Sequence, residues 1–369
     1  MEKTLFNTTP GALAGLRVLE FAGLGPAPFA CMMLADMGAE IITLSRPGSS
    51  DSAGPQVIGR GRNICEVDLK DPDSIRMVKT LIKNADVLIE GFRPGVMERL
   101  GLGPEETMAI NPRLVYGRMT GWGQQGPKSR LAGHDINYIA LTGALHATGT
   151  RESGPVHPLN LLGDYGGGSL YLLVGILSAL IERGQSGLGQ VVDAAITDGV
   201  LSMMSLSCEQ AFFGQFNEKR SSNLLDGGTP WYGVYETADG KHVAVGSLEP
   251  QFYALLCQTL GLDRSLLDAQ NDTTRHDEVQ AALEHAFASK TRDEWAEIFK
   301  DSDACVTPIL TLSEAAADPH HRAREAFVDV DGKRVPAPAP KLSRTPSTIK
   351  ALTSKKIENL SSAIKHWTS

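Results

Sequence analysis

Residues 17–44 read RVLEFAGLGPAPFACMMLADMGAEIITL, and this stretch decides the fold. Apolar residues dominate 17–21 and predict a strand, whereas the glycines and prolines of 23–28 predict a tight loop. Residues 29–37 predict a helix, and a second strand follows at 40–44. A strand, a helix and a strand at this spacing form a βαβ unit, whose right-handed crossover makes the two strands parallel.

The same pattern continues along the chain. Further strands are predicted at 86–90 and 113–117, and an apolar helix over 166–183 precedes a buried strand at 190–193 and a helix over 197–215. Parallel strands that end in Gly or Pro turns form open sheets, which bind ligands at the carboxyl ends of their strands. We therefore expect an α/β fold with a Rossmann-like parallel sheet in a large domain.

A smaller α+β domain is predicted next. Residues 231–237 and 241–245 are β-rich and flank an Asp-Gly turn, the strongest short hairpin signal, and helical periods follow up to Lys300. After Val335 the sequence Pro-Ala-Pro-Ala-Pro predicts an extended segment. We expect a large domain over 1–224, a small domain over 225–325, and a segment 326–369 that returns to the large domain.

Composition narrows the class of protein. The 369 residues carry a net charge of −8, with 42% hydrophobic and 6% aromatic residues, as in soluble globular proteins. Proteins that bind nucleic acid or anionic membranes are usually basic, so we expect neither partner. The apolar run 170–181 is short for a bilayer span, and residues 1–10 do not resemble a secretory signal. Five scattered cysteines without C-x-x-C spacing favour a reduced, cytoplasmic protein.

The first loop does not match a dinucleotide fingerprint. Gly23 and Gly25 have the required spacing, but Pro28 replaces the third glycine. Arg46 follows the second strand, where an NAD site places an acidic residue that holds the ribose. A cation there suits a ribose phosphate, which leaves NADP or coenzyme A open. Further cations near predicted turns suit phosphates too, although any one of them taken alone is more often a solvated surface charge: Lys70, Arg93 and Arg99.

Three segments carry candidate acid–base groups. Residues 133–138 read GHDINY, residues 163–168 read GDYGGG, and Glu249 precedes Pro250. Each has a structural alternative, since Asp135, Asn137, Asp164 and Glu249 are all suited to cap helices. A histidine and an aspartate are bases of different kinds, and two bases on opposite faces of one carbon are what a 1,1-proton transfer requires. No metal-ligand spacing competes with this interpretation.

Six ordered segments resemble the racemase branch of the class III (CaiB/BaiF) CoA-transferase family, whose members act on α-methylacyl-CoA. They span almost the whole chain: residues 15–21, 33–40, 87–95, 133–138, 187–193 and 246–253. The resemblance implies an interlocked homodimer in which active sites lie between the large domain of one subunit and the small domain of the other. It also implies a 2-methylacyl-CoA substrate and no separate cofactor, since coenzyme A is part of the substrate.

The resemblance assigns roles to individual residues. His134 and Asp164 match the two bases that invert the α-carbon through an enolate, with donors near Asp164 stabilising it, and Glu249 matches a residue that orients the histidine. Other positions match the CoA groove: Arg46, Val67, Asp68, Leu69, Lys70, Gly91, Phe92, Arg93, Arg99, Gly133, Asp135, Ile136, Asn137 and Tyr138.

Two other activities stay open. In the transferase branch of the family, an aspartate at the place of Asp164 is a nucleophile that forms an anhydride and then a CoA thioester while CoA moves between carboxylic acids. A non-catalytic acyl-CoA-binding protein is the third hypothesis. His134 together with Glu249 favours the isomerase, because a transferase has no need of a second base.

Overall fold

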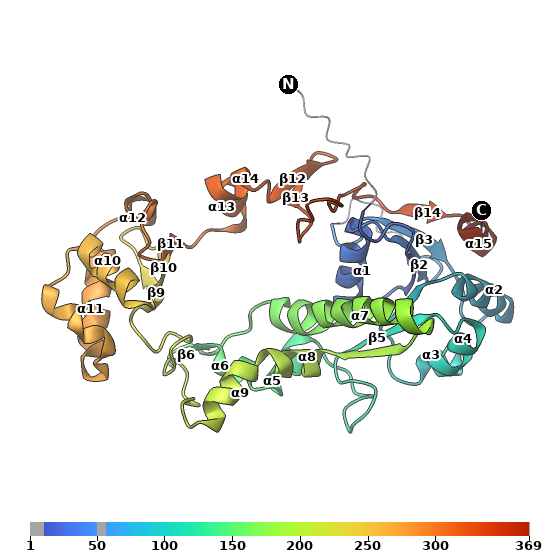
Figure 1. Ribbon diagram of the computed structural model, residues 1–369, viewed down its shortest axis with the longest axis horizontal. Coiled ribbons are helices and arrows are strands. Elements are labelled where there is room, and N and C mark those ends of the chain that lie inside the picture. Colours follow the sequence, from blue (N-terminus) through green and yellow to red (C-terminus); the bar gives the residue numbers. More distant parts are fainter. Residues whose placement is uncertain (1–10, 50–56, 369) are drawn as a thin grey trace. The chain divides into compact units, whose positions relative to one another are not determined.

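Seven parallel strands form the main sheet of the computed structural model, which describes residues 11–49 and 57–368 (Figure 1). Their order is β14-β3-β2-β1-β4-β5-β8. The strands are β1 (Arg17–Phe21), β2 (Glu40–Ser45), β3 (Arg62–Glu66), β4 (Val87–Glu90), β5 (Val115–Thr120), β8 (Val191–Ala195) and β14 (Lys355–Ile357). The expected Rossmann-like parallel sheet is confirmed, and its order reverses direction at β1 and β4, where open α/β sheets bind ligands.

The edge strand β14 was not predicted. It pairs in parallel with β3, with Lys356 opposite Ile64, so the C-terminal segment joins the sheet of the N-terminal residues. The strand is only three residues long and two of them are lysines. Short, charged strands are typical of sheet edges, where they discourage pairing with other chains, and they carry almost no apolar periodicity by which a sequence could reveal them.

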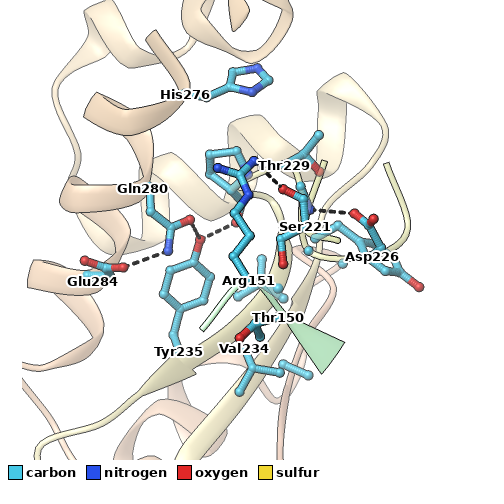
Figure 2. Close-up of a pocket in the computed structure, with 18 of the residues that line it drawn as sticks. Thr150, Arg151, Ser221, Asp226, Thr229, Val234, Tyr235, His276, Gln280 and Glu284 are labelled. Carbon is cyan, nitrogen blue, oxygen red and sulfur yellow. Dashed lines mark hydrogen bonds between the residues drawn. The ribbon is translucent and has the colours of Figure 1, made fainter. Parts of the chain in front are cut away.

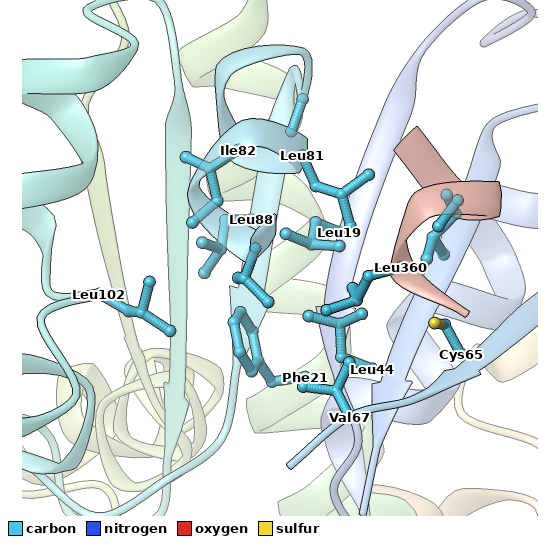
Figure 3. Packing of buried hydrophobic residues seen from close by; sticks show 14 of the residues in the cluster. Leu19, Phe21, Leu44, Cys65, Val67, Leu81, Ile82, Leu88, Leu102 and Leu360 are labelled. Carbon is cyan, nitrogen blue, oxygen red and sulfur yellow. The ribbon is translucent and has the colours of Figure 1, made fainter. Parts of the chain in front are cut away.

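Helices cover both faces of the sheet. On one face α2 (Pro72–Lys83) and α15 (Leu360–Thr368) enclose a core that includes Leu19, Phe21, Leu81 and Leu360 (Figure 3), and α4 (Pro104–Ile110) packs against α2. On the other face α7 (Tyr171–Ser186) packs closely on β5. A Cβ on Gly117 of β5 would lie 3.1 Å from Leu172 and 3.3 Å from Ile176, which explains a glycine inside this strand.

The chain divides into two units, each described separately below. Unit 1 holds Met1–Thr142, Pro158–Met204 and Pro319–Ser369, and unit 2 holds Gly143–His157 and Ser205–Asp318. These boundaries differ from the predicted ones after residues 224 and 325, and the assignment of Gly143–His157 to unit 2 was not expected. The expectation about a secretory signal concerns residues 1–10, which lie outside the described residues.

The longest helix of unit 1 exceeds its predicted length. A π-helix, Leu161–Leu170, continues into α7 and makes a helix of 26 residues, longer than the predicted 166–183. By length and composition alone it is long enough to cross a membrane, although 39% of its most apolar window is buried in the protein. The argument from the short run 170–181 therefore fails, and the absence of a membrane partner stays a prediction.

The remaining elements of unit 1 are α1 (Pro26–Asp36), α3 (Val96–Arg99), α5 (Asp135–Ala140), α8 (Ile196–Met203), α14 (Pro319–Ala323), β12 (Phe327–Val330) and β13 (Lys333–Pro336).

Unit 2 is built on a small antiparallel sheet of order β11-β10-β9. The predicted hairpin is confirmed as β9 (Tyr232–Glu236) and β10 (His242–Gly246), and β11 (Val306–Pro308) was not predicted. Its core is rich in aromatic side chains, among them Trp231, Phe287 and Trp295. Its other elements are α6 (Ala144–Ala147), β6 (Gly149–Thr150), β7 (Gly154–Pro155), α9 (Ser205–Phe212), α10 (Pro250–Leu260), α11 (His276–Phe287), α12 (Arg292–Phe299), α13 (Leu312–Ala317) and the 3-10 turns Arg264–Leu266, Asp268–Asn271 and Thr273–Arg275.

Candidate active site

Asp164 lies in the first turn of the π-helix. Turns of this type are rare and wide, and they occur often at functional sites. Gly163 is necessary here, because a Cβ at this position would lie 2.3 Å from Oδ2 of Asp135. The prediction that Asp164 comes immediately before the helix is wrong, since the helix begins at Leu161 and Asn160 precedes it. Asp164 is thus not a helix cap, and its carboxylate is left for another role.

The surroundings of Asp164 fix both its backbone and its carboxylate. Its N–H donates to Oδ2 of Asp135 at 2.6 Å, and its C=O accepts the Ser169 hydroxyl at 3.0 Å. The carboxylate faces the first loop of unit 1, since a Cβ on Gly25 would lie 3.0 Å from Oδ2 of Asp164. Gly25 has a φ of 72°, a conformation that favours glycine, and it immediately precedes α1. The loop therefore makes room for the candidate base.

The pKa of Asp164 is raised above its ordinary value. Burial is the main cause, and the nearby carboxylate of Asp135 adds to it, while a hydrogen bond from Asn160 and the charge of His134 act in the opposite direction. Burial disfavours an isolated anion, and a like charge does the same. Asp164 therefore holds a proton more readily than an ordinary aspartate, as a group that alternates between base and acid must.

His134 immediately precedes the short helix α5 and is exposed. Its N–H donates to Oδ1 of Asn137 at 3.0 Å, and its C=O accepts the Asn137 N–H at 2.8 Å. The alternative that Asn137 is a capping residue is therefore correct. These bonds fix the backbone of His134 at the start of α5. Its charge acts on Asp164, which lies in the same unit.

Asp135 has a role that the sequence analysis missed. Its side chain is 8% exposed, Oδ2 accepts the Asp164 N–H, and buried Oδ1 has no hydrogen-bond partner among the described residues. Its described hydrogen bond supports the backbone of Asp164, and its assignment as a CoA contact stays a prediction. Two features of the sequence could have indicated this contact. Asp135 directly follows the candidate base His134, and Gly163 directly precedes the candidate base Asp164.

Tyr138 extends the site toward the turn after β4. Its ring meets Trp122 edge to face at 4.8 Å between centroids, and its hydroxyl donates to the C=O of Gly133. Burial raises the pKa of Tyr138, the charge of Asp164 raises it further, and the charge of Arg93 lowers it. Tyr138 is therefore within electrostatic reach of both a candidate base and a predicted CoA contact.

Three of the cations predicted to bind CoA come after the carboxyl ends of strands. Arg46 follows β2, Lys70 lies four residues beyond β3, and Arg93 follows β4, and all three are exposed. Arg99, also exposed, ends α3. Parallel pairing of β2 with β3 continues one step past the strands, where the Val67 N–H donates to the Ser45 C=O at 2.7 Å. The cations of neighbouring strands thus share one edge of the sheet.

The other residues of the predicted CoA groove differ in how deeply they are buried. Val67 is buried, Leu69 and Phe92 pack against the core, and Phe92 meets Phe21 edge to face at 6.1 Å. These three side chains anchor the groove backbone. The remaining groove positions are exposed or half-buried, namely Asp68, Gly91, Gly133, Ile136 and Asn137.

Glu249 lies in unit 2, directly before α10. It occupies the capping position, with Pro250 as the first helical residue, but its side chain makes no capping hydrogen bond to the helix. The capping alternative therefore holds for its backbone alone. The carboxylate is exposed, and its charge raises the pKa of the Cys305 thiol, after burial. That Glu249 orients His134 stays a prediction.

A cavity of about 900 Å³ lies within unit 2, and it contains none of the predicted site residues (Figure 2). Tyr235 on its wall is bonded to Gln280 at 2.9 Å, and Arg151 donates to the Ser221 C=O at 2.8 Å. Four carboxylates line it against the single arginine: Glu152, Asp226, Asp277 and Glu284. An acidic lining repels phosphates, so this cavity does not suit coenzyme A.

Comparisons with known proteins point to one family. The family model described as CoA-transferase family III matches residues 13–353. The α-methylacyl-CoA racemase of mouse is 46% identical over 337 residues, which cover 91% of this chain and 87% of the mouse protein. The human α-methylacyl-CoA racemase is 44% identical over 337 residues, with 91% and 88% covered. The crystal structure of a CaiB/BaiF family protein from Brucella suis superposes with a TM-score of 0.82 at 25% identity, covering 98% of this chain and all of that one.

Proposed function

The chain belongs to CoA-transferase family III, and from this premise we propose that it is an isomerase that interconverts (R)- and (S)-2-methylacyl-CoA thioesters. The observation that carries the proposal is the pairing, in one unit, of exposed His134 with Asp164, whose pKa is raised. Relatives that are 44–46% identical and named α-methylacyl-CoA racemase support it.

The reaction needs one base on each face of the α-carbon. One base takes the α-proton, and the electron pair of the broken C–H bond moves into the C–C bond while the thioester C=O becomes an enolate oxygen. The other base, protonated beforehand, delivers its proton to the opposite face, and the enolate electrons form the new C–H bond. His134 and Asp164 exchange roles between the two directions. After each turnover the base that took the α-proton releases it to solvent and the other base takes one proton from solvent, which restores the starting state.

One of the donors expected to stabilise the enolate oxygen is already engaged within the protein. Donors near Asp164 were expected to face the enolate, but the Asp164 N–H donates to Asp135 at 2.6 Å. That N–H is therefore engaged within the protein. Tyr138 is a nearby hydroxyl donor, although its hydroxyl is bonded to the Gly133 C=O. We propose that the groove cations Arg46, Lys70, Arg93 and Arg99 hold the phosphates of CoA and so bring the thioester to the two bases.

Deuterium exchange tests the proposal. A single enantiomer of a 2-methylacyl-CoA, incubated with the protein in D₂O, is expected to gain α-deuterium and to lose optical purity, as mass spectrometry and chiral chromatography would measure. Lack of exchange over a range of acyl chains would reject the isomerase. Transfer of CoA to a free carboxylic acid, with Asp164 trapped by hydroxylamine, would establish the transferase alternative. CoA-ester binding without either reaction would indicate a binding protein.

We further propose that the protein works as a homodimer and that Glu249 serves the His134 of a second subunit. Apolar side chains on and after α9 support an interface, since none of the α9 residues is buried within the chain and Phe212 and Phe213 are 83% and 63% exposed. Co-expression of His134→Ala and Glu249→Ala chains tests this arrangement. Hybrid dimers would contain one intact site and regain activity, whereas recovery would be absent if each chain forms its own site.

A cofactor-independent reaction and a cytoplasmic location complete the proposal. Coenzyme A enters as part of the substrate, and proton transfer needs no redox group. Dialysis against a chelator is expected to leave exchange unchanged, and loss of activity that a metal ion restores would contradict this expectation.

A further inference from the structure

Glu90 is a fully buried acid that the proposed proton transfer does not use. It is the last residue of β4 and is 0% exposed. Its Oε2 accepts the Phe92 N–H at 2.7 Å, and its Oε1 accepts Nε of Arg118 at 3.0 Å. A buried carboxylate is costly unless it is hydrogen-bonded, and here one oxygen is bonded to the turn after the strand and the other to the neighbouring strand β5.

Arg118 connects this acid to the far end of the same turn. Its Nη1 donates to Oε1 of Glu98 at 2.8 Å, and Glu98 lies in α3. Glu90 precedes the turn Gly91–Gly95 and Glu98 follows it, so one guanidinium holds both ends. Gly95 adopts a φ of 83°, which turns the chain sharply into α3. Arg93 lies between Glu90 and Glu98, and Arg99 directly follows Glu98.

The ion pair of Glu90 with Arg118 does more than fill space in the core. An apolar side chain would fill the same space without the cost of desolvating an ion pair, and buried pairs of this kind add little net stability. What an apolar residue cannot do is accept the Phe92 N–H and pair with Arg118 together. Burial raises the pKa of Glu90 to about 7, against the opposing effects of Phe92 and Arg118.

We propose that Glu90 is a positioning residue, which with Arg118 and Glu98 holds the turn Gly91–Gly95 so that Arg93 is presented to the phosphates of coenzyme A. The inference rests on the proposed function, because it takes Arg93 to be a phosphate contact. Glu90 itself does not touch the ligand, and it acts through the Phe92 N–H and the shape of the turn.

A double-mutant cycle on coenzyme A binding tests the inference. Titration calorimetry with free coenzyme A would measure Kd for the native protein, Glu90→Gln, Arg93→Ala and the double variant. We expect each single change to raise Kd about tenfold, since each forfeits one charged contact or its alignment. If Glu90 acts through Arg93, the double variant also shows about tenfold, whereas independent effects would multiply to about a hundredfold.

A matched control separates positioning from general destabilisation. Asp36 and Arg60 form another buried ion pair of unit 1, at 2.5 Å, far along the chain from the turn. Asp36→Asn is expected to lower the free energy of unfolding, to leave Kd within about twofold, and to show no coupling with Arg93→Ala. Coupling of equal size in this variant would overturn the inference.

The remaining outcomes are also decisive. If Glu90→Gln does not fold, Glu98→Gln replaces it, because Glu98 is 42% exposed at its side chain and is bonded to the same guanidinium. Additive effects in either cycle overturn the inference and leave the proposed function intact. Failure of the native protein to bind coenzyme A rejects both.

Discussion

Carboxylates in the two units differ in the direction of their pKa shifts. In unit 1, burial is the leading cause that raises the pKa of Asp36, Glu90, Asp164 and Asp193. Among the described residues of unit 2, hydrogen bonds are the leading cause in every displaced carboxylate and all are lowered: Glu152, Asp239, Asp263, Asp272, Glu278, Glu294 and Glu314.

The difference teaches where proton chemistry is located. A carboxylate whose pKa is lowered stays ionised and serves as a helix cap or ion-pair partner, whereas one that is raised toward neutrality exchanges a proton during a reaction. Unit 1 also has lowered carboxylates, at Asp71, Glu98 and Asp329, so its environment is mixed. Four predictions test the comparison.

Asp164→Asn has the largest expected effect. The amide has the shape of the carboxyl group but does not take up a proton as a base, so we expect α-deuterium exchange to fall about a thousandfold. The Kd for coenzyme A should stay within about twofold. Exchange is measured in D₂O, and Asp263→Asn in unit 2 is the control that should retain full exchange. A native exchange rate in Asp164→Asn would show that the raised pKa values of unit 1 do not mark the residues that transfer protons.

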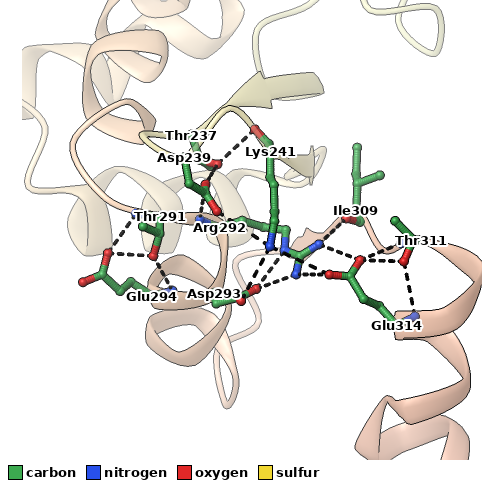
Figure 4. A network of polar contacts seen from close by, with 10 residues as sticks. All are labelled: Thr237, Asp239, Lys241, Thr291, Arg292, Asp293, Glu294, Ile309, Thr311 and Glu314. Carbon is green, nitrogen blue, oxygen red and sulfur yellow. Dashed lines mark hydrogen bonds and ion pairs between the residues drawn. The ribbon is translucent and has the colours of Figure 1, made fainter.

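Arg292→Ala should lower stability and leave coenzyme A affinity unchanged. Arg292 is 4% exposed and donates to both oxygens of Glu314 at 2.8 and 3.0 Å, while its N–H donates to Asp239 at 3.0 Å (Figure 4). Removal of this buried cation should lower the free energy of unfolding by about 3 kcal/mol, measured by urea denaturation. Arg275→Ala, which breaks an exposed pair with Glu278, should cost much less. A large change in coenzyme A affinity in Arg292→Ala would contradict a purely structural role.

The third prediction compares Glu90 with Glu314 across pH. The pKa of Glu90 is about 7 in the folded chain, against an ordinary 4.5, so between these values the folded chain retains a proton that the unfolded chain has released. Stability therefore falls as pH rises through this window, by about 3 kcal/mol. The pKa of Glu314 is lowered, so its contribution is present above the ordinary value and is lost as pH falls below it.

The two glutamines should reveal these opposite signs. Glu90→Gln should flatten the decline between pH 4.5 and about 7, and Glu314→Gln should remove a loss of stability that occurs only in acid. Urea denaturation at several pH values measures both. Slopes of the same sign would show that burial and hydrogen bonding do not divide the units as described.

The part of this molecule that the sequence could predict was the part with local periodicity. Strands such as β1 and β2 alternate with a helix at a spacing that only a βαβ unit satisfies, and the β9–β10 hairpin has its Asp-Gly turn. The strand β14 stayed hidden because it is short and basic, and it pairs with β3, almost 300 residues earlier in the chain. Local patterns contain no information on such a pairing.

The site was predictable to the same extent. His134 and Asp164 were found from polar residues beside glycines, but the start of the helix at Leu161 was not, because a π-helix has no propensity signature. The support that Asp135 gives to Asp164 and that Glu90 gives to the turn depends on burial, which follows from the packing of distant strands. The residue types thus indicated acid–base chemistry, whereas tertiary contacts determined which carboxylates are buried and supported so that they can take part in it.

Asp135→Asn has the smallest expected effect and tests the comparison most finely. Asparagine keeps an oxygen that accepts the Asp164 N–H, but it removes the charge that adds to the raised pKa of Asp164. Burial, the larger cause, remains, so the pKa of Asp164 should fall only in part. For the enantiomer that Asp164 deprotonates, the acidic limb of kcat/KM against pH should therefore move to lower pH, and the rate at neutral pH should drop less than about tenfold.

A purely structural role for Asp135 would not move that limb. Asp193→Asn is the matched control, since Asp193 is also a raised carboxylate of unit 1 but accepts from Gln124 at 3.3 Å and not from Asp164. An unmoved limb in Asp135→Asn, in a protein of native stability, would mean that burial alone raises the pKa of Asp164. The contrast between the units would then be one of solvent exposure, with no contribution from the pairing of two acids.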